Sequence, residues 1–246
     1  MSTEPDRVDL WVIPTDQPAP VVERLAGLLD RSERDRAAQA DQAGHGDRFR
    51  TVHGAVRLLA AERLGLGPAA LTWSYGRHGK PGIAAVGAAG LQLSYSASDS
   101  LAVLALAQGR RVGADVEELR DERVAARVAV RYFSSEDARY VTSAASAGAR
   151  SDRFTRLWCR REACVKVYGG RLAQGLDLRL AGVGPLLLPD VGRLDDGPCR
   201  VQDVSVPGAF RAAVAAEGSH PFRVRVRHWS ADSLTATTPL RHSSAT

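Results

Sequence analysis

The sequence lacks any apolar run long enough to cross a bilayer. Its longest runs, such as LAVLALA at 101–107, are far shorter than the roughly 20 residues that a transmembrane helix needs. The N-terminus, MSTEPDRVDLWVIP, is acidic at its start and has no long apolar core, which argues against a secretory signal. Cysteine is scarce: Cys159, Cys164 and Cys199 are an odd number without metal-ligand spacing. We therefore expect a soluble cytoplasmic protein with reduced thiols and no membrane partner.

Aromatic residues make up only 6% of the chain, and it carries no recognition motif for nucleic acid. Few side chains are therefore available to stack on bases, and we expect no nucleic-acid partner. The formal net charge of +5 favours an acidic partner, such as a phosphorylated small molecule or an acidic protein. The 246 residues, 44% hydrophobic and 25% charged, suffice for one large domain or for two smaller halves packed together.

Short strands and three or four helices along the chain predict an α+β fold. Amphipathic helices are expected at 48–64, ended by Gly65, and at 152–168. The strands LQLSYS, LAVLALAQ and VGADVE follow one another so closely that they predict a small antiparallel meander. The segment GLDLRL alternates as a strand does, and 143–151 is expected to be a loop.

Two pairs of polar residues stand out. In VGADVEELR, Asp115 and Glu117 point the same way, because a strand alternates its faces, and they look toward solvent or a cation. In WCRREACVK, Glu162 and Lys166 are one helical turn apart and share a face. Taken alone, the first pair is the charged end of a strand and the second is a helix salt bridge.

The glycine loop GRHGKPG changes this interpretation. Its bare backbone could approach a phosphate closely, with Lys80 beside it. Three carboxylates around one point repel one another unless a cation lies between them, and Mg²⁺ prefers oxygen ligands completed by phosphate. Lys166 would neutralise the same phosphate. Together these residues predict metal-assisted phosphoryl or phosphodiester transfer.

The order G-K-P, G-x-D-x-E and W-x-x-[KR]-E-A-x-x-K resembles the Sfp-type 4′-phosphopantetheinyl transferases, over about 47–180. The helix that carries Arg57 and the segment YFSSED are similar to that family too. The resemblance implies two similar α/β halves forming an intramolecular pseudo-dimer, each with a small sheet packed on helices. We place the N-terminal half at 1–118 and the C-terminal half at 119–230. The Ser/Thr/Ala-rich end, 231–246, is expected to be a disordered tail.

The resemblance also implies an activity. The 4′-phosphopantetheine group of coenzyme A would be transferred to a serine of an apo acyl or peptidyl carrier protein. Mg²⁺ would be the cofactor, and adenosine 3′,5′-bisphosphate would be released. Because a chain of two halves needs no second copy to complete its cleft, we expect a monomer. Whether the carrier serves fatty-acid, polyketide or peptide synthesis stays open.

Motif matching implies roles for particular residues. Asp115, Glu117 and Glu162 would hold Mg²⁺, and the expected catalytic residues are Asp115, Glu162 and Lys166. Glu162, or a water beside it, is the candidate base for the carrier serine. The residues expected to bind coenzyme A are Gly79, Lys80, Pro81, Tyr95, Arg57, Lys166, Arg34 and Arg36. For the last two, a solvated helix face is an equal alternative.

The chain departs from the family pattern at three positions. Tyr95 stands where a histidine is usual, Arg161 replaces the lysine before the glutamate, and Arg171 replaces a glycine after Lys166. Tyrosine keeps a hydrogen-bonding group but has no cationic form near neutrality. The departures at Tyr95 and Arg171 leave open a catalytically degenerate coenzyme A-binding protein. A nucleic-acid-binding domain, suggested by the basic charge alone, is the least favoured alternative.

Overall fold

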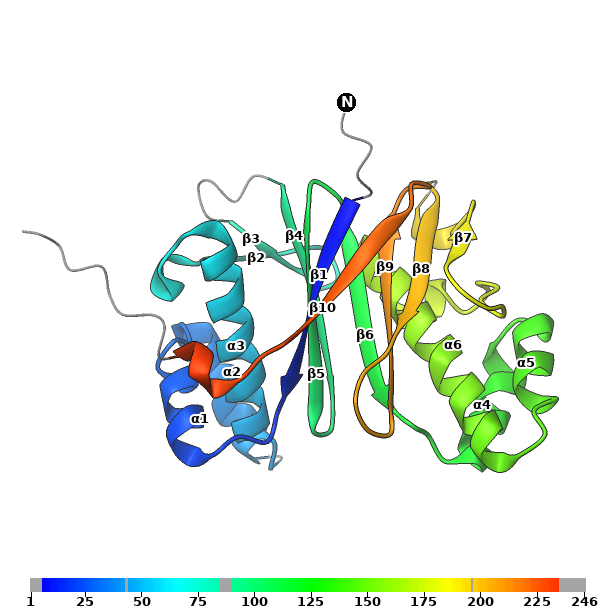
Figure 1. Cartoon of the computed structure of the whole chain (residues 1–246), viewed down its shortest axis with the longest axis horizontal. Coiled ribbons are helices and arrows are strands. Elements are labelled where there is room, and N and C mark those ends of the chain that lie inside the picture. The colour runs from blue at the N-terminus through cyan, green and yellow to red at the C-terminus, as the bar shows by residue number, and fades with distance from the viewer. Residues whose placement is uncertain (1–5, 43, 85–89, 196, 235–246) are drawn as a thin grey trace, which may run out of the picture.

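The computed structural model describes residues 6–42, 44–84, 90–195 and 197–234. The expected mixture of helices and strands is confirmed. Two four-stranded sheets face each other in the middle of the molecule, and helices cover the outer side of each sheet (Figure 1). Each half is thus a small sheet packed on helices.

The first sheet has the strand order β10-β1-β5-β4 and is covered by the helices α1, α2 and α3. The strands of this sheet are β1 (Asp6–Pro14), β4 (Leu91–Ser98), β5 (Leu101–Gln108) and β10 (Phe222–His228). The helices are α1 (Ala19–Ala26), α2 (Arg31–Gln42) and α3 (Gly46–Leu64). A short hairpin lies beside it, formed by β2 (Trp73–Tyr75) and β3 (Pro81–Ile83).

The second sheet has the order β6-β9-β8-β7 and is covered by the helices α4, α5 and α6. The strands of this sheet are β6 (Val112–Glu118), β7 (Leu186–Leu188), β8 (Cys199–Val204) and β9 (Phe210–Glu217). The helices are α4 (Glu122–Tyr132), α5 (Ser135–Thr142) and α6 (Ala147–Tyr168). The inner faces of the two sheets pack aliphatic side chains against each other, among them Val8, Leu10, Val103, Val112 and Val214. This shared apolar layer joins the halves.

The helix predicted at 48–64 is α3, and it ends as expected at Gly65, which adopts a left-handed conformation with φ 66°. The helix predicted at 152–168 is α6, but it begins earlier, at Ala147. Ser146 caps it by accepting a hydrogen bond from the backbone N–H of Ala149 at 3.2 Å. The loop expected at 143–151 is therefore wrong for its second part.

The predicted meander is only half right. β4 and β5 form an antiparallel pair, but β6 pairs antiparallel with β9 in the other sheet. The last strand of the chain, β10, returns to the first sheet and runs parallel to β1. β6 therefore belongs to the second sheet although it lies within 1–118, and β10 belongs to the first sheet although it lies within 119–230. The two sheets do not coincide with the expected division of the chain.

Two further segments differ from expectation. The segment GLDLRL forms no strand, because the buried Arg161 side chain binds its carbonyl groups: Nε donates to Gly175 O at 3.0 Å and Nη2 to Leu178 O at 3.0 Å. The start of the expected tail, Ala231–Leu234, is a single 3₁₀ turn, and Leu234 is buried. Residues 235–246 lie outside the described ranges. None of the helices within these ranges is long and apolar enough to cross a membrane.

Candidate active site

A glycine lets helix α6 pack directly on strand β6. A Cβ atom at Gly113 would lie 1.9 Å from Ala163 O and 2.7 Å from Val167 N, which are backbone atoms of the helix. Only glycine leaves room for this approach. The first residue of the G-x-D-x-E motif thus brings the α6 side chains within reach of the β6 carboxylates.

Asp115 is at the centre of the site. Its side chain is buried, and Oδ1 accepts hydrogen bonds from Lys166 Nζ at 2.7 Å and from Ser96 Oγ at 2.7 Å. Its other oxygen, Oδ2, is buried and has no hydrogen-bond partner among the described residues. A buried carboxylate oxygen without a donor is costly unless a cation or water binds it.

The other two predicted metal ligands flank Asp115. Glu117 Oε2 accepts from Ser98 Oγ at 3.2 Å and from Arg120 Nη2 at 2.9 Å. Glu162 lies on α6 and lines a cavity of about 320 Å³, together with Lys80, Tyr95 and Lys166. Burial raises the pKa of the Glu162 carboxyl, and the negative charges of Asp115 and Glu117 raise it further, while Lys166 partly offsets them.

As the side chains stand, no three acidic, histidine or cysteine groups in the described ranges come close enough to hold a metal. The donor chemistry nevertheless fits a hard divalent cation. Asp115 offers a buried oxygen without a hydrogen bond, and Glu162 experiences the repulsion of two neighbouring carboxylates. Both features are relieved by a positive charge between these groups.

The G-K-P segment closes the cavity from the first half. Gly79 has φ 85°, a conformation that favours glycine, and Pro81 begins β3. Lys80 Nζ donates to Val112 O at 3.0 Å and to Val167 O at 2.8 Å, so it links the hairpin to β6 and to the end of α6. Burial lowers the pKa of Lys80 to about 8, and Arg111 contributes to this shift. The predicted phosphate contact of Lys80 stays a prediction.

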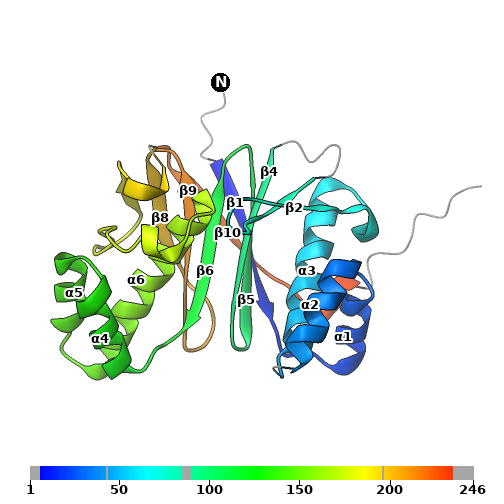
Figure 2. The ribbon, with the colours of Figure 1, turned by 180° about the vertical axis from the view of Figure 1, so that it is seen from behind.

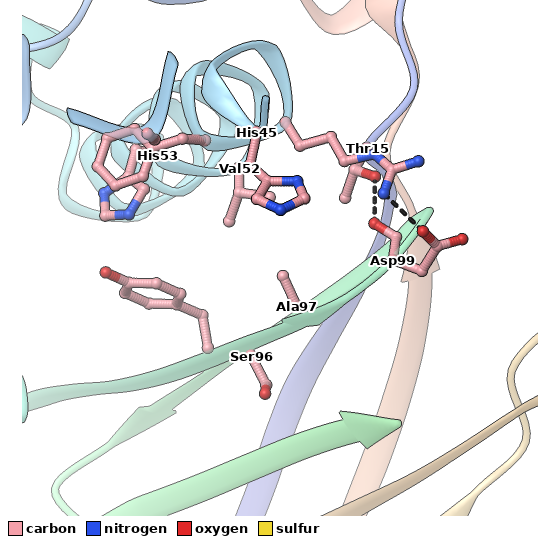
Figure 3. Close-up of a pocket in the computed structure, with 11 residues that line it drawn as sticks. Thr15, His45, Val52, His53, Ser96, Ala97 and Asp99 are labelled. Carbon is pink, nitrogen blue, oxygen red and sulfur yellow. Dashed lines mark hydrogen bonds and ion pairs between the residues drawn. The ribbon is translucent and has the colours of Figure 1, made fainter. Parts of the chain in front are cut away.

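Tyr95 lines this cavity and also a second one, of about 460 Å³, between β4 and α3 (Figure 3). The ring of His53 lies edge-on to Tyr95, with 5.4 Å between centroids. Figure 3 shows His45, Val52 and His53 on the helix side and Ala97 on the strand side. Burial raises the pKa of Tyr95 to about 12, so the phenol stays neutral.

The three arginines predicted to bind coenzyme A have different surroundings. Arg57 is buried and donates to Glu33 Oε2 at 2.7 Å and to Leu71 O at 2.7 Å, so the structure does not bring it into the site. Arg34 is exposed and donates to the carbonyl of Leu29. Arg36 is exposed as well, and its charge partly offsets the rise that burial causes in the pKa of Tyr95. The Arg36 guanidinium lies 5.3 Å from the ring centre of Phe49, which lines the larger cavity.

Several residues at the site were not predicted. Ser96 and Ser98 bind the carboxylates of Asp115 and Glu117, and Arg120 pairs with Glu117. Cys159 is buried near Asp115, and burial, then the Asp115 charge, raises the pKa of its thiol, which keeps it protonated. Alternate serines in LQLSYSAS were a visible signal of a polar strand face.

Comparison with known proteins agrees with this geometry. The profile of the 4′-phosphopantetheinyl transferase superfamily matches residues 111–190, which include β6 and α6. The 4′-phosphopantetheinyl transferase HetI of Nostoc sp. is 30% identical over 177 residues, which cover 72% of this chain and 74% of that protein. The chain therefore belongs to the 4′-phosphopantetheinyl transferase superfamily, a family of transferases.

Two further relatives are similar over shorter or more divergent stretches. The 4′-phosphopantetheinyl transferase of Bacillus subtilis is 27% identical, covering 71% of this chain and 76% of that protein. The L-aminoadipate-semialdehyde dehydrogenase-phosphopantetheinyl transferase of Eremothecium gossypii is 35% identical, covering 56% of this chain and 51% of that protein. Of these two names, only the second states which protein is modified, so the family alone does not choose the acceptor.

Proposed function

We propose that the protein transfers the 4′-phosphopantetheine group from coenzyme A to a serine of an apo acyl or peptidyl carrier protein, with Mg²⁺ as cofactor. One observation carries this proposal. The Lys166–Asp115 pair, with its unpartnered carboxylate oxygen, adjoins a cavity that Glu162 and the G-K-P hairpin line from opposite halves. Because both halves of one chain supply the cavity, we also infer that the protein acts as a monomer.

The chemistry assigned to the chain's own residues follows from this arrangement. The serine oxygen of the carrier attacks the phosphorus that bears pantetheine, and the bond from that phosphorus to the adenosine phosphate breaks. Glu162, or a water beside it, accepts the serine proton. Lys166 binds the phosphate oxygens with its ammonium group. Adenosine 3′,5′-bisphosphate is the other product.

The residues that would hold Mg²⁺ are Asp115, Glu162 and Glu117. When bound, the cation supplies neutralisation of the pyrophosphate charge. Lys166 Nζ lies 2.7 Å from Asp115 Oδ1 and therefore neutralises the aspartate when no cation does so. With the aspartate charge balanced by a cation instead, the Lys166 ammonium group would be free to bind the phosphates.

The test is to incubate the protein with coenzyme A, Mg²⁺ and an apo carrier protein and to measure the carrier by mass spectrometry. Transfer adds the phosphopantetheine mass to one serine, and a carrier with that serine changed to alanine is the control. A carrier panel from fatty-acid, polyketide and peptide synthases identifies the acceptor. Coenzyme A binding without any transfer to that panel would instead support the alternative of a degenerate coenzyme A-binding protein.

A further inference from the structure

Strands β4 and β6 lie side by side where the two halves meet (Figure 2), and serine hydroxyls join them. Ser94, Ser96 and Ser98 are alternate residues of β4 and therefore share a face. Figure 3 shows Ser96 pointing away from α3. β6 pairs its backbone with β9, so its edge beside β4 receives side-chain contacts.

The donors and acceptors fix which way two of these hydroxyl protons point. Ser96 Oγ accepts from Lys166 Nζ at 2.9 Å, because an ammonium group can only donate. The single hydroxyl proton of Ser96 is therefore donated to Asp115 Oδ1, 2.7 Å away. Asp115 Oδ1 thus accepts hydrogen bonds from both Ser96 and Lys166, while Oδ2 has no hydrogen-bond partner among the described residues.

The same reasoning applies one pleat further along the strand. Ser98 Oγ accepts from the backbone N–H of Glu118 at 3.1 Å, so its proton is donated to Glu117 Oε2 at 3.2 Å. Ser94 differs from the other two: its Oγ accepts from the backbone N–H of Ala114 at 3.0 Å, and its partner is not a carboxylate.

We propose that Ser96 and Ser98 are positioning residues, which hold Asp115 and Glu117 with defined oxygen atoms available to the cation. Ser96 has the larger role, because it selects Oδ2 of a buried aspartate as the free oxygen. The first half thereby orients carboxylates that belong to the second sheet. This inference rests on the proposed function, since it assumes that the carboxylates bind a cation.

The test measures cation affinity separately from activity. Mn²⁺ is titrated into the protein at saturating coenzyme A, and free Mn²⁺ is followed by electron paramagnetic resonance. Partners of metal ligands are typically worth 10–100-fold in metal affinity. We expect Ser96→Ala to weaken Mn²⁺ binding about ten-fold or more, and Ser98→Ala less. Ser96→Thr, which keeps the hydroxyl, should recover most of the affinity.

Ser94→Ala is the matched control, because it removes a hydroxyl from the same face of the same strand without touching a carboxylate. It should lower the melting temperature and leave Mn²⁺ affinity within about two-fold, since the hydrogen bond it loses joins its hydroxyl to the backbone N–H of Ala114 and not to a carboxylate. If Ser96→Ala behaves like Ser94→Ala, the serines merely join the strands and the proposal is overturned.

A second measurement keeps the inference separate from the proposed function. If the wild-type protein binds no Mn²⁺, the cation part of the proposed function fails. Crystal structures of the wild-type protein and of Ser96→Ala then decide whether Ser96 positions Asp115. A rotated Asp115 carboxylate in the variant supports positioning, and an unchanged rotamer refutes it.

Discussion

Lys166 Nζ lies 2.7 Å from Asp115 Oδ1, and the aspartate side chain is only 3% exposed. The ammonium group therefore balances a buried carboxylate that the proposed function assigns to a cation. In the proposed function both the ammonium group and the cation are needed for transfer, yet they would compete for the negative charge of Asp115. A variant without the ammonium group should therefore lose activity and yet bind the cation more tightly.

The first prediction is that Lys166→Met loses carrier modification by at least about 100-fold, because the phosphate loses its charge-assisted donor. The same variant should bind Mn²⁺ more tightly than the wild-type protein in the absence of coenzyme A, since no ammonium group competes for Asp115. Added Mg²⁺ should accordingly raise its melting temperature more than that of the wild-type protein. Equal or weaker Mn²⁺ affinity in Lys166→Met would contradict this account.

The second prediction concerns Glu162, whose carboxyl pKa is raised by burial and by Asp115. A carboxyl pKa that is higher in the folded than in the unfolded chain lowers stability as pH rises from about 4.5 through the folded value. Glu162→Gln removes this loss. The free energy of unfolding of the metal-free variant should therefore exceed that of the wild-type protein at pH 8, and the difference should shrink toward pH 4.5.

Urea denaturation at several pH values measures this difference, while carrier modification by Glu162→Gln should be lost at every pH. Glu136→Gln is a control, because this glutamate is exposed on α5. A stability gain for Glu162→Gln that does not depend on pH would mean that repulsion among the carboxylates is not its cause.

The third prediction tests the close approach of α6 to β6. Gly113→Ala places a Cβ atom 1.9 Å from Ala163 O, so the helix must shift away from the strand. Overpacking of this kind costs about 1–3 kcal/mol or more. The control is Gly148→Ala in α6, where a Cβ atom meets nothing within 4 Å and should be neutral or stabilise by up to about 1 kcal/mol. Denaturation of both variants checks the contrast.

The site could be predicted from sequence to the extent that its chemistry is local. Strand alternation put Asp115 and Glu117 on one face, helical spacing did the same for Glu162 and Lys166, and the family resemblance brought the two pairs together. The structure has Lys166 paired with Asp115 rather than with Glu162, because Gly113 lets α6 pack directly on β6. That contact joins distant segments, and neither motif reveals it alone.

The errors in the fold have the same origin. Three neighbouring strands predict a meander by their spacing, yet β6 pairs with β9, about 100 residues later in the chain. GLDLRL has the alternation of a strand, but Arg161 and Asp137 bind its backbone: Asp137 Oδ1 accepts from Leu180 N at 3.0 Å. Partners far away in the sequence determine the pairing of β6 and the conformation of GLDLRL, so the local residue pattern cannot predict either.

The fourth prediction concerns Tyr95, which lines both cavities and stays neutral. If its hydroxyl contacts a phosphate of coenzyme A, Tyr95→Phe should weaken coenzyme A binding several-fold, a loss consistent with one hydrogen bond. Tyr95→His should be tolerated and should bind more tightly at pH 6 than at pH 8, because histidine titrates near neutrality. Calorimetry with coenzyme A checks this, and equal affinities in all three proteins at both pH values would exclude the contact.

The last prediction distinguishes two roles of Lys80. Its Nζ donates to backbone carbonyls of β6 and α6, at 3.0 Å from Val112 O and 2.8 Å from Val167 O. Lys80→Met leaves both carbonyls without this donor, and we expect it to lower the free energy of unfolding by about 1–3 kcal/mol at pH 7. Arg77→Met, which removes an exposed charge from the same turn, should change it by no more than about 0.5 kcal/mol.

The structural role of Lys80 also predicts how the free energy of unfolding changes with pH. Because burial lowers its folded pKa from 10.5 to about 8, the unfolded chain binds the proton more tightly between these values. This group therefore adds stability as pH rises through that window. A neutral amine still has two protons, one for each carbonyl, so the link between the halves persists. From pH 8 to pH 10, the free energy of unfolding of the wild-type protein, measured by urea denaturation, should thus rise relative to that of Lys80→Met. A variant that loses coenzyme A affinity but keeps wild-type stability throughout would show instead that Lys80 serves the phosphate alone.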